Sequence, residues 1–178
     1  MRARRARQIA ILRFENADYS QFRDSLQAAA LIYGLEPTFP TDIQLTVEIS
    51  AAEVDRRQRD AVSLILSSKE QLDQQSPVLL VTDQDLFAER MRFVFGLANK
   101  DLGIAVMSTS RLTEWVEDLT PSRIQERILK EAAHEIGHLR GLPHCERESC
   151  LMSFSNTIEK VDLKLPMLCD ACERKLRR

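Results

Sequence analysis

Three histidines in the C-terminal part of the chain have the spacing of metal ligands. They are His134, His138 and His144, and the 178 residues contain no other histidine. On an α-helix, residues four positions apart project from one face, so the first two can offer imidazole nitrogens to a single Zn²⁺. Gly141 suits the left-handed turn that ends such a helix, and Pro143 cannot continue the helix. The chain can therefore return His144 to the metal as a third ligand.

Three protein ligands leave the fourth position of a tetrahedral zinc open, which is the pattern of a catalytic site. Glu135 follows the first histidine directly and is poorly placed to be a ligand. It can instead reach a zinc-bound water as a general base. The alternative is an amphipathic helix end that carries solvated histidines. The glycine at the helix end and the third histidine at fixed spacing favour the metal site.

All four cysteines follow the histidine-rich stretch, as two close pairs. The first pair is Cys145 and Cys150, and the second is Cys169 and Cys172. Two thiol pairs brought together form a closed Cys₄ zinc site, which is structural. Because Cys145 adjoins His144, this site would also hold the third ligand of the open site. Two disulfides or unlinked thiols are the alternatives, and a reducing compartment would disfavour the disulfides.

The order of these residues resembles a known family. His-Glu-x-x-His-x-x-Gly-x-x-His is the metzincin signature. Here it is followed at once by a cysteine, then by Cys150-x-Met152 and by Cys169-x-x-Cys172. Over residues 134–172 the sequence therefore resembles the archaemetzincins, a family of zinc metallopeptidases.

The resemblance implies a metzincin-like fold of the mixed α/β class. That fold has a twisted, mostly parallel sheet with one antiparallel edge strand, a backing helix, an active-site helix and a small C-terminal subdomain stapled by zinc. The edge strand, expected within residues 91–108, would line a cleft and receive extended substrate through main-chain hydrogen bonds. The resemblance also implies that Met152 forms a Met-turn beneath the catalytic zinc. An ordinary core methionine is the alternative.

We therefore expect a zinc-dependent metallopeptidase with two Zn²⁺ per chain, one catalytic and one structural. The alternative is a catalytically weak or latent module that binds peptides or has a regulatory role. The retained Glu135 argues against it, because a pure binder needs no base. Endopeptidase and aminopeptidase action both stay open. Some metzincins support the oxyanion with a tyrosine near the Met-turn, but Tyr19 and Tyr33 lie far upstream. Asn156 or a backbone N–H are candidates for that role.

Length and composition are those of an ordinary globular domain. The chain is 44% hydrophobic and 29% charged, and we expect one metallopeptidase domain over residues 1–178. Within it we expect an N-terminal subdomain, 8–141, with an active-site helix over about 121–140, and a C-terminal subdomain, 142–178. No apolar run approaches the ~20 residues that span a bilayer. The basic N-terminus lacks the apolar stretch of a signal peptide, so we expect a cytoplasmic protein.

We expect a monomer that acts on a peptide or small protein, with no nucleic-acid or membrane partner. The net charge is −2, but eight of the 25 basic residues lie at the two ends of the chain. Basic ends could contact nucleic acid, but short clusters without interleaved aromatic residues are a poor footprint for such binding. Solvated termini explain them better.

Hydrophobic periodicity predicts the elements around these sites. Strands are expected at residues 8–14, 43–49, 77–82, 91–97 and 103–108, and helices from Asn16 or Asp18 to Tyr33 and over 56–73. The continuous apolar run at 77–82 is typical of a central parallel strand, and the Asp83-Gln84-Asp85 run after it of a loop rather than a cation site. The short link between the last two strands makes them antiparallel. Thr120 and Pro121 can begin the histidine-bearing helix.

Overall fold

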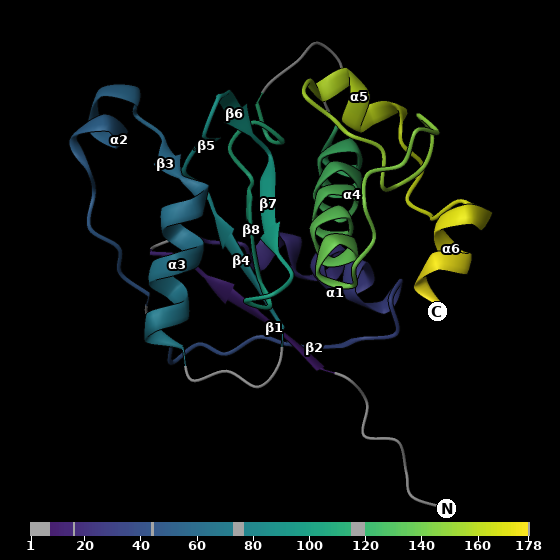
Figure 1. The fold of residues 1–178 in the computed structure, drawn as a ribbon, viewed down its shortest axis with the longest axis horizontal. Helices are drawn as coiled ribbons and strands as arrows, with labels where there is room; N and C mark the ends of the chain where they lie inside the picture. The colour runs from purple at the N-terminus through teal and green to yellow at the C-terminus, as the bar shows by residue number, and fades with distance from the viewer. Residues whose placement is uncertain (1–7, 16, 44, 73–76, 115–119, 178) are drawn as a thin grey trace, which may run out of the picture.

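A twisted sheet with helices on both faces forms the centre of the molecule (Figure 1). This computed structural model describes residues 8–15, 17–43, 45–72, 77–114 and 120–177. Helix α3 (Ala61–Gln71) covers one face of the sheet. Helices α1 (Arg23–Leu31) and α4 (Pro121–Leu139) pack against each other on the opposite face.

Within the described ranges, the central sheet contains five strands in the spatial order β2-β1-β4-β8-β7. Their bounds are β1 Gln8–Arg13, β2 Glu36–Thr38, β4 Val78–Thr82, β7 Gly96–Asn99 and β8 Ile104–Ser108. The pairs β1–β2, β1–β4 and β4–β8 are parallel, whereas β7 is antiparallel to β8 and forms an edge. The predicted fold class, a mostly parallel sheet with one antiparallel edge strand, is confirmed.

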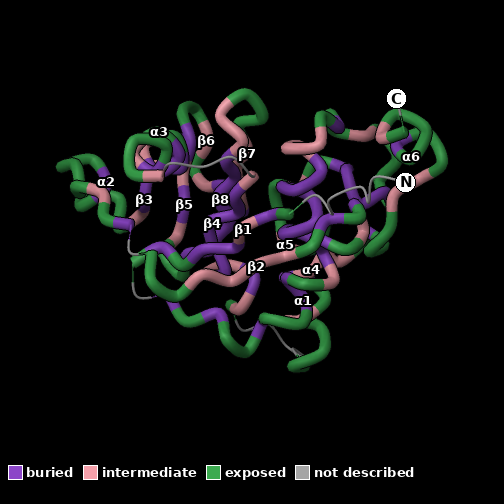
Figure 2. The backbone as a smooth tube through the Cα atoms, turned by 90° about the horizontal axis from the view of Figure 1, so that it is seen from below, coloured by how far each residue is buried: buried purple, intermediate pink, exposed green. Residues whose placement is uncertain are grey.

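Strand β4 shows why the sheet needs helices on both sides. All five of its residues are buried. Leu79 and Val81 belong to the apolar core under α1 and α4, and Val78 and Leu80 to the core under α3. Successive side chains of a strand point to opposite faces, so a run that is apolar throughout requires cover on both. Figure 2 shows this burial concentrated on the central strands and on the inner sides of the helices.

The prediction of a strand over residues 43–49 is wrong. No strand lies there among the described residues, and the edge position beside β1 in the central sheet is taken by β2, which contains Pro37. Leu45 is buried, but Ile49 is 58% exposed, so the alternating pattern reflects only partial packing. The main chain of Thr46 bonds to the side chain of Gln71 at 3.2 and 2.8 Å instead of to a neighbouring strand.

A smaller three-stranded sheet, ordered β3-β5-β6, lies beside the central one. Its strands are β3 (Arg59–Asp60), β5 (Leu86–Ala88) and β6 (Met91–Val94). The single strand predicted over residues 91–97 is therefore wrong, because the chain leaves this sheet at Val94 and joins the central sheet at Gly96. That change of sheet turns β7 toward α4.

Two predicted helices differ from the observed ones at their boundaries. The helix predicted over 56–73 is observed as the shorter α3. A separate helix, α2 (Ala51–Arg56), precedes it and ends where Arg57 takes a left-handed φ of +54°. Asp60 then caps α3 by accepting from the Val62 N–H at 3.1 Å. The first helix begins as a 3₁₀ turn at Ser20–Phe22 and ends at Leu31, short of Tyr33. Asn16 lies outside the described residues.

Helix α4 starts and ends by the local chemistry that the sequence suggested. The Thr120 hydroxyl accepts from the Arg123 N–H at 3.3 Å, and Pro121 takes the first helical position. At the other end Gly141 has a φ of +84°, and its N–H donates to the His138 carbonyl at 2.8 Å. This left-handed turn redirects the chain immediately after the second histidine.

After α4 the chain carries two short helices, α5 (Ile158–Leu163) and α6 (Asp170–Leu176). Two ion pairs tie this segment to α4: the buried Arg127 to the partly exposed Asp162 at 2.7 Å, and Glu131 to Lys164, both buried, at 2.9 Å. Helix α6 lies at the edge of the molecule beside the loop that follows α4 (Figure 1). No helix in the described part of the chain is both long and apolar enough to cross a membrane.

Candidate metal centres and cleft

The three histidines converge on one point. His134 and His138 lie one turn apart on α4, and His144 follows the turn at Gly141. One ring nitrogen from each lies within 4.8 Å of the others. The Nε2 atoms of His134 and His138 are 3.1 Å apart, as expected of two nitrogens that share a metal.

Backbone carbonyls fix the orientation of two of these rings. His134 Nδ1 donates to the Leu151 carbonyl at 3.0 Å, and His138 Nδ1 donates to the Leu142 carbonyl at 2.8 Å. A carbonyl only accepts, so Nδ1 carries the proton and the Nε2 lone pair is free. Metal-binding histidines are typically held by a partner of this kind on the other ring nitrogen.

Burial keeps the histidines in the form that binds a metal. Burial, followed by the Lys164 charge, holds the pKa of His134 well below its ordinary value. Partial burial of the rings is also the main cause that lowers the pKa of His138 and of His144, the most exposed of the three. Neutral imidazole is the metal-binding form, so the site favours a cation over a proton.

Glu135 lies beside the histidines with one oxygen unpaired. The residue is 3% exposed, and its Oε2 has no hydrogen-bond partner among the described residues. Burial and, next, the neighbouring Glu131 carboxylate raise its pKa well above the ordinary value. An unpaired buried carboxylate is costly, and a divalent cation within reach would relieve it. The residues present therefore fit a metal at this site.

Strand β7 passes directly over Glu135 at Gly96. A Cβ built on Gly96 would lie 2.6 Å from Glu135 Oε1, closer than real Cβ contacts allow. Glycine is therefore required here for the edge strand to approach the carboxylate. The sequence interpretation did not single out this residue, although a lone glycine inside a strand pattern signals close backbone approach.

The histidines and Glu135 line a cavity of about 370 Å³. Its walls are formed by β6 of the smaller sheet, β7 of the central sheet, α4 and the segment after Met152. Its lining residues are Met91, Val94, Phe95, Gly96, Leu97, Ala98, Lys100, Glu131, His134, Glu135, His138, His144, Phe154 and Ser155. The edge strand expected near the cleft is therefore β7.

An ion pair that sequence reasoning missed lies at the edge of this cavity. Glu131, one helical turn before Glu135, accepts from Lys164 Nζ at 2.9 Å, and the two side chains are 3% and 0% exposed. The Lys164 charge also lowers the pKa of Glu135 and of the histidines. The spacing of four residues places Glu131 on the same face of α4 as Glu135, so the sequence could have indicated this half of the ion pair. Nothing in the sequence indicated its partner, Lys164.

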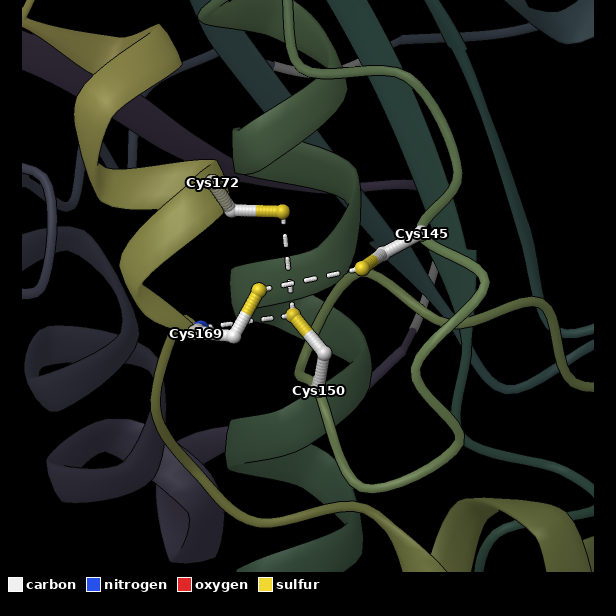
Figure 3. A group of neighbouring side chains, drawn as sticks. All are labelled: Cys145, Cys150, Cys169 and Cys172. Atoms are coloured by element: carbon white, nitrogen blue, oxygen red, sulfur yellow. Dashed lines mark hydrogen bonds between the residues drawn. The ribbon is translucent and has the colours of Figure 1, made fainter.

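The four cysteine sulfurs point toward a common centre (Figure 3). Cys145 and Cys150 lie in the loop after α4, and Cys169 and Cys172 at the start of α6. The Sγ atoms of Cys145 and Cys169 are 3.8 Å apart, as are those of Cys150 and Cys172. A disulfide needs about 2.05 Å, and all four cysteines are free. Four sulfurs at ~2.3 Å from one zinc would lie roughly 3.8 Å apart.

Main-chain groups support the thiolate form of Cys169, whereas burial raises the pKa of Cys150 and of Cys172. The backbone N–H of Cys169 donates to Cys150 Sγ at 3.4 Å. The backbone N–H of Cys172 is the main cause that lowers the pKa of Cys169 to about 6. Thiolate is the metal-binding form of cysteine, so the donor chemistry fits a structural zinc.

Met152 packs beneath the histidine-bearing turn of α4. It is fully buried, and Tyr33 Oη lies 3.6 Å from its Sδ. A Cβ on Gly137 would overlap both Met152 Sδ and Tyr33 Oη. The Cys145 N–H donates to the Met152 carbonyl at 2.8 Å, which links the Met152 turn to the cysteine cluster.

The side chains that the sequence analysis considered for oxyanion support do not line the cavity with the histidines, whereas Ser155, which it did not consider, does. Asn156 lines a neighbouring cavity of about 240 Å³ with Arg111 and Phe93. Tyr19 Oη donates to the Ile11 carbonyl at 3.0 Å, away from the cleft. Ser155, in contrast, lines the same cavity as the histidines.

Comparisons with known proteins agree on one family. The model of peptidase family M54 matches residues 20–178. The Aeropyrum pernix protein named archaemetzincin is 44% identical over 99 residues, which cover 56% of this chain and 52% of that protein. This alignment thus spans about half the length of that curated relative.

Two solved structures share the fold over nearly the whole chain. The crystal structure of archaemetzincin from Methanopyrus kandleri has a TM-score of 0.83 at 29% identity and covers 100% of this chain and 98% of that one. The crystal structure of a zinc-dependent peptidase from Methanocorpusculum labreanum has a TM-score of 0.80 at 27% identity, with coverage of 94% and 99%.

Proposed function

Because the chain belongs to peptidase family M54, in agreement with its resemblance to the archaemetzincins, we propose that it is a zinc-dependent metallopeptidase that hydrolyses peptide bonds. One observation carries the proposal. Three histidine nitrogens converge within 4.8 Å, and the unpaired Glu135 carboxylate lines the same cavity as these histidines. Metal ligands, a base and space for substrate therefore coincide.

His134, His138 and His144 hold the catalytic zinc. When bound there, zinc supplies Lewis acidity that polarises a peptide carbonyl and acidifies water. Carbonyl acceptors at Leu151 and Leu142 keep the first two Nε2 atoms aimed at the metal.

Glu135 is the general base and, later, the general acid. Its carboxylate takes a proton from the attacking water and returns it to the leaving amine, so the carboxylate is regenerated in each cycle. Burial suits this role, because a raised pKa makes a carboxylate a better proton acceptor near neutral pH.

The substrate is an extended peptide that lies along β7. The strand pairs with β8 on one side only, so its other edge is open to a further strand. Gly96 allows that strand to run close above Glu135. The cavity of about 370 Å³ suits one side chain of the peptide next to the scissile bond.

The four cysteines hold a second, structural zinc, which gives two Zn²⁺ per chain. In this assignment Met152 forms the Met-turn, an apolar base below the catalytic site. The C-terminal subdomain, residues 142–178, is then stapled by Cys₄ ligation, and residues 8–141 form the N-terminal subdomain with the active-site helix.

Both sites are built from one chain, so a monomer suffices. Four free cysteines arranged as zinc thiolates suit the reducing environment of the cytoplasm, where we place the protein. We assign it no nucleic-acid or membrane partner.

The test is cleavage of a mixed peptide library by the zinc-loaded chain. A matched library with acetylated N-termini separates endopeptidase from aminopeptidase action, since only the latter needs a free amine. We expect chelation to abolish cleavage and added zinc to restore it. Binding of peptides without turnover by the fully zinc-loaded chain would replace the proposal with a peptide-binding module.

A further inference from the structure

A buried serine hydroxyl at the cleft has no partner in the described part of the chain. Ser155 lies three residues after Met152 and lines the cavity with His144 and Glu135. Its Oγ is shielded from solvent and has no hydrogen-bond partner there. Leaving a buried donor unpaired is costly, so native structures seldom do so without a functional reason.

Another serine hydroxyl in the same segment does have a hydrogen-bond partner. Ser153 lies two residues before Ser155, and its Oγ donates to the Glu148 carbonyl at 2.9 Å. The unpaired hydroxyl is thus the one on the residue that lines the cavity. The other shielded and unpaired serine hydroxyl among the described residues is that of Ser68, on α3 across the sheet from α4.

Peptide hydrolysis develops negative charge on the scissile carbonyl oxygen, and a preorganised donor at that oxygen stabilises the transition state. Apart from the histidines, the cavity offers side-chain donors from Lys100 and Ser155. Lys100 is exposed on the turn between β7 and β8, so its ammonium group is hydrated. Ser155 is the shielded donor of the two.

The aromatic residues of this region supply no alternative. Tyr33 Oη is buried against Met152 Sδ at 3.6 Å, below the floor of the cleft. The ring of Phe154 lies 5.1 Å from that of His144, between centroids, but carries no donor. The hydroxyl next to this phenylalanine is therefore the shielded side-chain donor among the residues that line the cavity.

We propose that Ser155 is a catalytic residue whose hydroxyl donates a hydrogen bond to the scissile carbonyl oxygen as the carbonyl carbon becomes tetrahedral. The proposal rests on the peptidase function above. Rotation about χ1 alone redirects Oγ between staggered positions. Because Oγ has no partner in the free protein, donation breaks no existing hydrogen bond. Ser155 keeps its proton throughout, while water supplies the oxygen and Glu135 carries the transferred proton.

The kinetic test compares Ser155→Ala with Ser68→Ala on a peptide that the wild type cleaves. A bond made only in the transition state lowers kcat and kcat/KM together, and we expect a loss of roughly 10²- to 10³-fold. Zinc content and melting temperature should stay at wild-type values. Ser68→Ala removes an equally buried and unpaired hydroxyl far from the cleft, so it should keep wild-type kinetics. Ser155→Thr retains the hydroxyl and should recover most of the loss.

A binding test separates this proposal from the proposed function. A phosphinic peptide carries a tetrahedral, anionic centre, and by calorimetry it should bind Ser155→Ala about 10²-fold more weakly than wild type. Its planar peptide counterpart, measured in a Glu135→Gln background that does not cleave it, should bind equally well with and without Ser155→Ala. Unchanged kcat, or a rise in KM alone, would overturn the role of Ser155. A wild type that cleaves nothing would defeat the peptidase proposal, and the phosphinic peptide would still decide for or against Ser155.

Discussion

The histidine cluster and the cysteine cluster are neighbours in sequence but differ in their surroundings. The histidines border a cavity of about 370 Å³, and His144 is exposed. Two of the cysteines, Cys150 and Cys172, are 2% exposed, and the four sulfurs face one another between the loop after α4 and the start of α6. One cluster borders an open cavity and the other is closed around its own centre.

This comparison indicates that the number of ligands and the access to the site, rather than the proximity of the ligands, distinguish a catalytic metal site from a structural one. Three donors with an adjoining cavity leave a coordination position for chemistry, while four mutually facing thiols leave none. The chain connects the two clusters directly, because Cys145 follows His144. The Cys145 N–H also donates a hydrogen bond to the Met152 carbonyl. The closed site should therefore govern stability, and the open site activity.

The largest effect should come from breaking the closed site. Cys172→Ser removes a buried sulfur ligand, and zinc binding in small thiolate sites is worth about 10–16 kcal/mol of folding free energy in peptides. A loss of even a part of this should lower the melting temperature, by roughly 2–4 °C for each kcal/mol in a chain of this size. The matched variant His138→Ala should abolish cleavage but melt near wild type. Melting scans with zinc counted per chain distinguish them, and equal destabilisation by both would contradict the division of roles.

The next effect concerns the ion pair that joins α4 to the C-terminal segment. Lys164→Met leaves the Glu131 carboxylate buried and unpaired, and we expect a loss of about 3–5 kcal/mol in the free energy of unfolding by urea. Adding Glu131→Leu removes the stranded charge and should recover much of that loss. If the single and double variants are equally unstable, the pair contributes through packing and not through charge.

A smaller effect should follow from crowding the apolar base that lies under the histidine-bearing turn. Gly137→Ala places a methyl group against Met152 and Tyr33, and overpacking of this kind costs about 1–3 kcal/mol. The urea midpoint should fall while the denaturant slope stays constant. Gly137→Ala in a Tyr33→Phe background, which lacks the phenol oxygen, should be less destabilising. Wild-type stability of Gly137→Ala would show that the contact is loose.

The smallest effect is the acid sensitivity of the α4–α5 contact. Hydrogen bonds from Arg127 are the main cause that holds the pKa of Asp162 below its ordinary value of 3.8. A lowered pKa means that the folded state favours the carboxylate, so this stabilisation is complete above the unfolded value and is lost as pH falls below about 4. Urea unfolding of wild type and Asp162→Asn should differ at pH 6 and converge toward pH 3. A constant difference at both pH values would show that the Asp162 charge is not the cause.

The sequence specified the ligand geometry because that geometry is local. The spacing of His134 and His138 on a helix and the glycine turn at Gly141 follow from backbone rules that act within a few residues. The continuous apolar run of β4 likewise predicted a strand covered on both faces. For such features, residue type and spacing alone carry the information.

Features that depend on distant segments escaped prediction. The partner of Glu131 is Lys164, 33 residues away, and no periodicity links them. Residues 43–49 alternate like a strand, yet Gln71 takes the main-chain hydrogen bonds of Thr46. The close approach of Gly96 to Glu135, just after the break between β6 and β7, is likewise visible only in the folded chain.

The most direct test of the open site is Glu135→Gln, with cleavage and bound zinc measured on the same samples. The substitution keeps the shape of the side chain but removes the base. We predict two zinc ions per chain in both proteins and a fall in kcat of about 10²- to 10⁴-fold in the variant. Unchanged cleavage at equal zinc content would show that Glu135 is not the base and that the histidine site works by other means.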